Sequence, residues 1–142
     1  MNHVLPDVTL GIVGGGQLGR MLGEAATPLG VETVVLDPTG DCPAFPPAAD
    51  QIVAEFDDHS AITTLAERVD VLTLEIELAD PDALESVIEA TGTPVHPAPA
   101  DLRMTRDKLR EKQALESADI PIPGYVGIED SSDLEAAFEV LG

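Results

Sequence analysis

The chain has 142 residues, enough for one ordinary domain or for one domain and part of another. Hydrophobic residues make up 44% and aromatic residues only 3%, with no Trp, so the core must be built from aliphatic side chains. Acidic residues number 27 against 7 basic ones, which gives a formal net charge of −20. This balance excludes the basic face that nucleic-acid binding needs.

The acidic charge admits two interpretations. An acidic patch could face a basic partner, or the whole surface could be acidic because the protein works in concentrated salt, where self-repulsion is screened. The acidic residues are spread along the whole chain and seldom form runs. This distribution favours salt adaptation.

The sequence shows no sign of disulfide bonding, metal binding or export. Cys42 is the only cysteine, and His3, His59 and His96 are too far apart to give a metal-ligand spacing. The first residues lack a basic segment followed by a long apolar stretch, and no stretch approaches the ~20 apolar residues of a membrane span. We therefore expect a cytoplasmic protein with no membrane segment.

The most informative stretch covers residues 9–27. Residues 9–13 form an apolar run typical of a buried strand, residues 14–19 read G-x-G-x-x-G, and a helix is predicted from Arg20 to about Thr27. Glycines permit a tight turn and a close approach by a ligand. The first amides of the following helix carry partial positive charge, so the pattern predicts a phosphate or carboxylate at this turn.

Up to residue 98 the chain alternates between expected strands and helices. After a helix stop at Leu29-Gly30, strands are expected at residues 32–36, 51–54, 71–77 and 93–95. One helix follows N-cap candidates at residues 57–60 and reaches residues 66–68; another follows Asp80, has Pro81 at its first position and ends before Gly92. The alternation predicts an α/β fold with a doubly wound parallel sheet and ligands at the carboxyl ends of its strands.

Several residues at the expected strand ends are candidates for a small-molecule site. Glu75 and Glu77, two positions apart, should point to one face and could accept hydrogen bonds from a substrate amine or from sugar hydroxyls; an exposed strand end is the alternative. Asp37 could hold a ribose hydroxyl or form a turn. Arg20 could contact a phosphate or lie on the surface. The proline-rich residues 38–50 have no periodic pattern, which indicates function or mobility.

Beyond Pro99 the character of the sequence changes. We expect a helix over residues 100–117, a short strand at residues 125–127 and a last helix from Asp130–Ser131 to Gly142, with further strands to follow in a second domain. Five of the seven basic residues lie on the first of these helices: Arg103, Arg106, Lys108, Arg110 and Lys112. They predict an anionic ligand such as a nucleotide phosphate; the alternative is a solvated helix with paired charges.

Motifs along nearly all of the chain resemble those of one enzyme family. They lie at residues 14–21 (GGGQLGRM), 35–38, 42–44, 48–50, 70–77, 106–109 and 120–123. They are similar to motifs of the 5-(carboxyamino)imidazole ribonucleotide synthases, ATP-grasp enzymes of purine biosynthesis. The resemblance implies a pre-ATP-grasp, Rossmann-like domain over residues 1–98 and the incomplete beginning of an ATP-grasp domain over residues 99–142.

The resemblance also implies ligands and an activity. The family couples ATP hydrolysis, assisted by Mg²⁺, to carboxylation of 5-aminoimidazole ribonucleotide by bicarbonate. The resemblance implies that Gly16, Gln17, Leu18 and Glu75 bind the ribonucleotide and that Lys108 contacts ATP. It places the catalytic and Mg²⁺-binding residues in a following segment, so we expect no substrate-dependent ADP formation by these 142 residues alone, and a homodimer for the full-length enzyme.

Two other interpretations stay open. The glycine motif with Asp37 also fits an NAD-type Rossmann module of an oxidoreductase or regulator, although residues 17–21 and Lys108 have no explanation there. A protein-interaction domain with a degenerate site is the other, because the catalytic half of the family pattern is not in this sequence. Titration with reduced nicotinamide dinucleotide and with aminoimidazole ribonucleotide would separate the first two interpretations.

The net charge generates the first testable prediction. With a charge of −20, self-repulsion should destabilise the fold in dilute buffer, and dissolved salt should screen it. We expect the melting temperature, measured by calorimetry, to rise with KCl into the molar range. A flat or falling curve would favour the acidic-patch interpretation.

Overall fold

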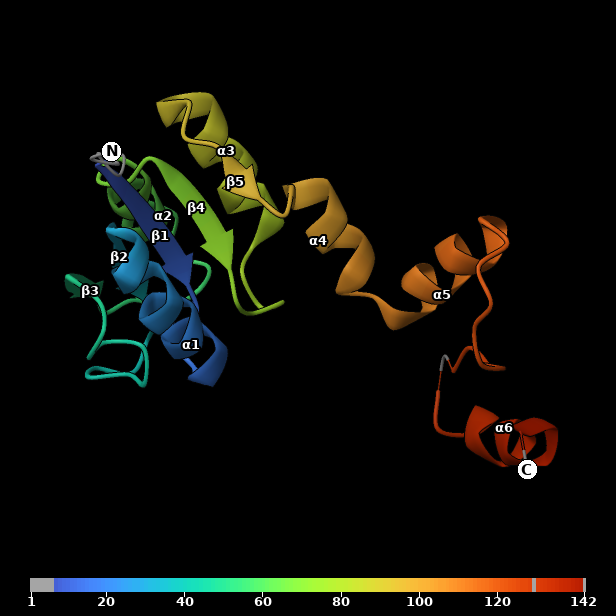
Figure 1. The fold of residues 1–142 in the computed structure, drawn as a ribbon. Coiled ribbons are helices and arrows are strands. Elements are labelled where there is room, and N and C mark those ends of the chain that lie inside the picture. Colours follow the sequence, from blue (N-terminus) through green and yellow to red (C-terminus); the bar gives the residue numbers. More distant parts are fainter. Residues whose placement is uncertain (1–6, 129, 142) are drawn as a thin grey trace. The chain divides into compact units, whose positions relative to one another are not determined.

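A computed structural model of the chain describes residues 7–128 and 130–141 (Figure 1). The chain divides into two compact units, Met1–Arg103 and Met104–Gly142. None of the helices in the described residues combines the length and the apolarity that a membrane crossing needs.

The first unit is built on a five-stranded parallel sheet in the order β3-β2-β1-β4-β5. The strands are β1 (Val8–Val13), β2 (Val31–Leu36), β3 (Asp50–Ile52), β4 (Val71–Leu74) and β5 (Val95–His96). From the central strand β1 the chain adds β2 and then β3 on one side. It then crosses over to add β4 and β5 on the other side of β1. The predicted fold class, a doubly wound parallel sheet, is confirmed.

Helices and a loop cover the two faces of this sheet. The larger core cluster packs α2 (His59–Ala66) and α3 (Pro81–Thr91) against one face, where Leu72 and Leu84 are fully buried. The smaller cluster includes Ile12, Val35, Cys42 and Ala44 and lies on the other face with α1 (Gln17–Ala26). Figure 1 shows α1 in front of β1 and β2, and α2 behind them.

Local sequence signals fix the starts of α2 and α3 and the stops after α1 and α3 as predicted. Asp58 caps α2 by accepting a hydrogen bond from Ala61 N at 3.0 Å. Asp80 caps α3 by accepting from Asp82 N at 3.1 Å, with Pro81 in the first helical position. A short 3₁₀ turn, η1 (Thr27–Leu29), follows α1 and ends at Gly30, and α3 ends at Gly92; both glycines are left-handed, with φ of 73° and 75°.

Several predicted boundaries in the first unit are wrong. Helix α1 begins at Gln17 rather than Arg20, because Gly16 is already its N-cap. Strand β4 ends at Leu74, not at residue 77, because its partner β1 ends at Val13 and leaves nothing further to pair with. The short outer strands β3 and β5 are each displaced by one to two residues from their predicted places, since each pairs with only one neighbour.

The segment beyond Pro99 differs more from prediction. The expected single helix is two, α4 (Pro99–Thr105) and α5 (Lys108–Ser117), because Asp107 is extended (φ −102°, ψ 105°) and its Oδ1 accepts from Leu109 N and Arg110 N. Within the described residues 120–128 there is no strand, since no neighbouring strand is available to pair. Helix α6 spans Asp133–Leu141, later than expected, and Gly142 lies outside the described residues.

A pair of glycines tests the role of the α3 stop. Gly92 and Gly40 both have open space where a Cβ would sit, but only Gly92 has a left-handed φ. We expect Gly92→Ala to lower the free energy of unfolding by about 1–2 kcal/mol, the cost of a Cβ in that conformation. Gly40→Ala is the matched control and should leave it nearly unchanged. Chemical denaturation measures both; equal effects would contradict the assigned backbone conformation.

Candidate functional site

The candidate site lies where the central strands end. Val13 is in register with Leu36 on one side and with Leu74 on the other, so β1, β2 and β4 end at one level. The next residues along the chain, Gly14, Asp37 and Glu75, therefore share one edge of the sheet. The structure brings together the three positions that the sequence had placed at the strand ends.

Two glycines of the turn are packed between neighbouring segments. Gly14 has a left-handed φ of 105°, and an added Cβ would lie 3.3 Å from Cβ of Glu75. An added Cβ on Gly15 would lie 2.3 Å from Sγ of Cys42, closer than real atoms approach. The turn therefore lies between Glu75 and Ile76 on one side and the loop containing Cys42 on the other, with little room for a side chain at Gly14 or Gly15.

Gly16 has a different environment. Its backbone is in an ordinary extended conformation (φ −71°, ψ −164°), and nothing lies within 4 Å of an added Cβ. It is the N-cap of α1 and, lacking a side chain, provides no side-chain hydrogen bond to the first amides of the helix. The open approach to these amides, with the partial positive charge of the helix end, is suited to an anion.

The side chains around this opening are exposed or half-buried. Gln17 is exposed and Leu18 is 62% exposed, both on the first turn of α1. Glu75 is half-buried and its amide donates to the carbonyl of Val13 at 2.9 Å. Glu77 lies in an exposed turn. The strand alternation that predicted a common face for Glu75 and Glu77 does not reach them, because β4 ends at Leu74. Of the two acids, Glu75 is the one that lies next to Gly14.

Asp37 takes the role of a turn former. Its Oδ2 accepts from Gly15 N at 2.8 Å and its Oδ1 accepts from Thr39 N at 2.8 Å. Both oxygens are therefore bonded to backbone amides of this chain. The ribose contact that a dinucleotide-binding module would make through this acid has to compete with those bonds.

The sequence indicated function or mobility for the proline-rich loop after Asp37, but not that this loop packs against the glycine turn. Cys42 and Ala44 are buried under the glycine turn, and Ala44 N donates to the carbonyl of Gly15 at 2.9 Å. Burial raises the pKa of the Cys42 thiol. The small residues at positions 42, 44 and 48 were a signal of close packing, but their partner is distant in sequence.

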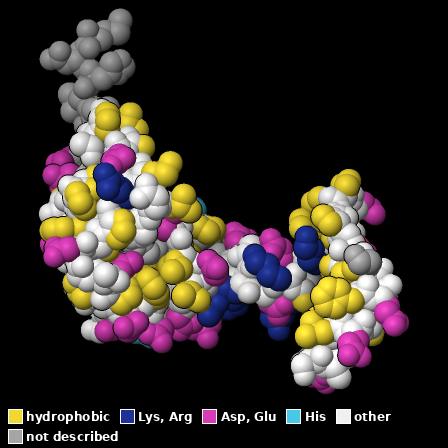
Figure 2. All heavy atoms as spheres, turned by 90° about the horizontal axis from the view of Figure 1, so that it is seen from below, with side chains coloured by type: hydrophobic (Ala, Val, Ile, Leu, Met, Phe, Trp, Pro, Cys, Tyr) yellow, Lys and Arg dark blue, Asp and Glu magenta, His cyan; other side chains and the backbone are white. Residues whose placement is uncertain are grey.

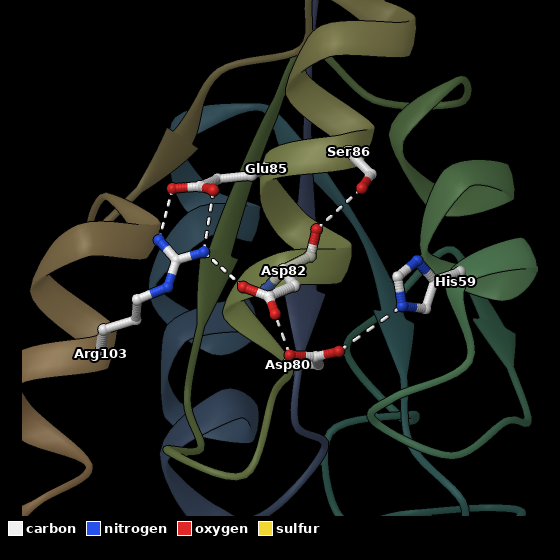
Figure 3. Close-up of polar contacts among 6 residues, drawn as sticks. All are labelled: His59, Asp80, Asp82, Glu85, Ser86 and Arg103. Atoms are coloured by element: carbon white, nitrogen blue, oxygen red, sulfur yellow. Dashed lines mark hydrogen bonds and ion pairs between the residues drawn. The ribbon is translucent and has the colours of Figure 1, made fainter.

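The basic residues of the first unit are engaged in ion pairs. Arg20 Nε donates to Glu24 Oε1 at 2.8 Å along the exposed side of α1. Arg103 pairs with Asp82 and Glu85 of α3 (Figure 3), and these hydrogen bonds raise the pKa of Arg103 while they lower that of Glu85. Arg68 Nη2 donates to Asp50 Oδ2 at 2.5 Å. These pairs favour the interpretation of paired, solvated charges for Arg20 and Arg103.

Lys108 belongs to the second unit. It is the first residue of α5, and its Nζ donates to Glu111 Oε2 at 3.0 Å and to the carbonyl of Thr105 at 3.2 Å. Its side chain is 76% exposed, so a phosphate could reach it in exchange for Glu111. Among residues 7–128 and 130–141, no three His, Cys, Asp or Glu side chains are placed to hold a metal ion.

The surface at the carboxyl edge offers few cations to an anionic ligand. Figure 2 views the molecule from the side toward which the arrowheads of β1 and β4 point in Figure 1. On the first unit it shows mainly hydrophobic, acidic and uncharged side chains. The exposed large hydrophobic residues beyond the strand ends include Leu18, Met21, Val53 and Leu78. Backbone amides are therefore the main donors that this edge presents to a phosphate or carboxylate.

Comparison with known families and proteins gives a consistent result. The ribonucleotide synthetase preATP-grasp domain family matches residues 8–106. A curated N5-carboxyaminoimidazole ribonucleotide synthase of Brucella melitensis is 42% identical over 137 residues, which cover 96% of this chain and 37% of that protein. The chain thus spans little more than a third of the length of this relative.

Solved structures are similar over most of the chain. The N5-carboxyaminoimidazole synthetase of Staphylococcus aureus, complexed with ADP, matches with a TM-score of 0.79 and 35% identity, covering 95% of this chain and 36% of that one. The Aspergillus clavatus N5-carboxyaminoimidazole synthase, in complex with ADP and 5-aminoimidazole ribonucleotide, matches with a TM-score of 0.80, 32% identity and the same coverage.

The contrast between Gly15 and Gly16 is directly testable. Gly15→Ala forces a Cβ against the Cys42 sulfur, and such overpacking should lower the free energy of unfolding by about 1–3 kcal/mol. Gly16→Ala meets no atom and should unfold at the same denaturant concentration as the parent. Urea titration of the two variants decides. Equal destabilisation would show that the turn is packed differently.

Proposed function

This chain belongs to the ribonucleotide synthetase preATP-grasp family, and we propose that it forms the substrate-binding N-terminal part of an N5-carboxyaminoimidazole ribonucleotide synthase. That enzyme carboxylates 5-aminoimidazole ribonucleotide with bicarbonate at the expense of ATP in purine biosynthesis. The similarity to synthases of this name supports the assignment, including a solved structure that contains both ADP and the ribonucleotide.

The observation that carries the proposal is that a place for an anion and an acceptor of hydrogen bonds lie together at the carboxyl edge of the sheet. The amides at the start of α1 favour an anion, and the half-buried Glu75 beside the turn favours hydrogen-bond donors. A ribonucleotide with a free amine carries a phosphate at one end and amine and hydroxyl donors elsewhere. Gly16, Gln17, Leu18 and Glu75 are the residues that we assign to its binding.

ATP is assigned to the second unit. Lys108, exposed at the start of α5, would exchange Glu111 for a nucleotide phosphate. Residues 1–98 would form the pre-ATP-grasp domain and residues 99–142 the beginning of the ATP-grasp domain; the division of the chain after Arg103 supports a boundary in this region. Mg²⁺ would neutralise phosphate charge during the transfer, and no ligand for it is assigned among the described residues. The homodimer, the cytoplasmic location and the salt adaptation stay predictions.

A dinucleotide-binding module is the less favoured alternative. In such a module the acid after the second strand binds a ribose hydroxyl. Here both oxygens of Asp37 accept backbone amides, from Gly15 and Thr39. Reduced nicotinamide dinucleotide should therefore give no binding heat with this chain, in contrast to aminoimidazole ribonucleotide.

Glu75 provides the test of the proposed site. Glu75→Gln should leave substrate donors poorly paired and weaken binding of 5-aminoimidazole ribonucleotide by about 1.5–3 kcal/mol, as for hydrogen bonds to a charged group. Calorimetric titration of the 142-residue chain measures this change. Gln17→Ala and Gly16→Ala should weaken binding as well, because both alter the approach to the first turn of α1.

Glu77→Gln is the matched control, since it removes the same charge two residues away in an exposed turn. It should bind the ribonucleotide like the parent. If Glu77→Gln weakened binding and Glu75→Gln did not, the roles of the two acids would be reversed. Binding unchanged in all four variants would place the pocket elsewhere.

A further inference from the structure

We propose that Asp37 is a positioning residue for ribonucleotide binding: its carboxylate holds Gly15 so that the amides at the start of α1 face the ligand. The inference rests on the proposed function of this edge, because it concerns how the same site is prepared. Asp37 itself need not touch the ligand. It acts through the backbone of the glycine turn.

The first two amides of the glycine turn are bonded to the end of β2 and the residue after it. Gly14 N donates to the carbonyl of Leu36 at 2.9 Å, and Gly15 N donates to Oδ2 of Asp37 at 2.8 Å. Two successive donors are thus taken up by the end of β2. The next residue, Gly16, is the N-cap of α1, and it provides no side-chain hydrogen bond to the amides that follow. By binding the amide of Gly15, Asp37 therefore determines that the amides available to a ligand are those after Gly15.

Gly15 is also held on its other side, by the loop that contains Cys42 and Ala44. Its carbonyl accepts from Ala44 N at 2.9 Å, and the buried Cys42 leaves no room for a Cβ on Gly15. Immediately after this fixed residue, Gly16 has open space. A turn fixed at one residue and open at the next is the arrangement expected when the backbone is preorganised for a bound group.

The two hydrogen bonds of Asp37 require a carboxylate rather than an amide side chain. Asp37 accepts two backbone amides with two different oxygens, from Gly15 and from Thr39. An asparagine has one oxygen, and its NH₂ group is a donor that would face one of these N–H groups. Charge-assisted bonds are also stronger than neutral ones. Asp37→Asn therefore keeps the shape of the side chain but should release the backbone of the turn or of the loop.

The chain offers a matched control for this substitution. Asp70 Oδ2 accepts from Thr9 N at 2.8 Å, the same length and the same kind of carboxylate–amide bond. Asp70 precedes β4 and Thr9 lies near the start of β1, so this bond is at the opposite edge of the sheet. Asp70→Asn removes the same charge and an equivalent bond without touching the turn.

The experiment compares Asp37→Asn, Asp37→Glu and Asp70→Asn in the ¹⁵N-labelled 142-residue chain, well below their melting temperatures. Calorimetry with 5-aminoimidazole ribonucleotide gives affinity, and amide spectra report on the turn. We expect Asp37→Asn to bind about tenfold more weakly, in the range of one lost charged hydrogen bond, and Asp70→Asn to bind like the parent. The NMR amide signals of Gln17 and Leu18 should shift only in the Asp37 variants. Hydrogen exchange of the Gly15 amide with solvent should likewise accelerate only in those variants.

Asp37→Glu distinguishes the effect of the position of the carboxylate oxygens from the effect of the negative charge. It keeps the negative charge but displaces the oxygens by one methylene, so it should also bind weakly; parental affinity in Asp37→Glu would overturn a role in positioning. Unmoved Gln17 and Leu18 signals in Asp37→Asn would overturn it too. If the parent itself does not bind the ribonucleotide, the proposed function fails, and the amide signals and Gly15 exchange still decide whether Asp37 positions the turn.

Discussion

The parallel pairing of β1 with β2 and β4 is the constraint on which the rest of the site depends. Because Val13, Leu36 and Leu74 end at one level, the glycine turn, Asp37 and Glu75 become neighbours although they are far apart in sequence. A shift of one residue in either pairing would move the following residue along the edge and turn the flanking side chains to the opposite face. The buried, aliphatic strands fix this register by packing against helices on both faces.

Given that register, two of the three consecutive glycines are needed for the fold, and the third is available for the proposed binding. Gly14 supplies the left-handed turn and Gly15 the close packing against Cys42, so both are required by the chain's own structure. Gly16 meets neither demand. An added Cβ there would meet no atom of the described fold, so we assign this position to the proposed ligand.

Features of the fold with local causes could be predicted from the sequence, and those with distant causes could not. The N-caps Asp58 and Asp80 act within three residues, so their helices were predicted correctly. The end of β4 depends on where β1 stops, and the expected strand near Tyr125 had no neighbour to pair with. Asp107 was a local signal that was overlooked inside a run of good helix formers. At the site, adjacency of Glu75 to the turn followed from topology, whereas the packing of Cys42 on Gly15 joins segments whose contact no pattern indicates.

The negative net charge of the chain makes the backbone amides at the start of α1 the main attraction available to the proposed anionic ligand. A chain with a formal charge of −20 repels anions at long range, and few cations lie at the carboxyl edge proposed for the ligand, where Arg20 is paired with Glu24. The Debye length is about 10 Å in 0.1 M salt and about 3 Å in 1 M salt, and repulsion between charges farther apart than this is largely screened. Hydrogen bonds from backbone amides act at contact and are not screened in this way. In concentrated salt the repulsion is therefore removed while the amides of α1 remain effective. An acidic surface and the proposed anion site of backbone amides are therefore compatible in that environment, because such a site does not depend on the basic side chains that are scarce in this sequence.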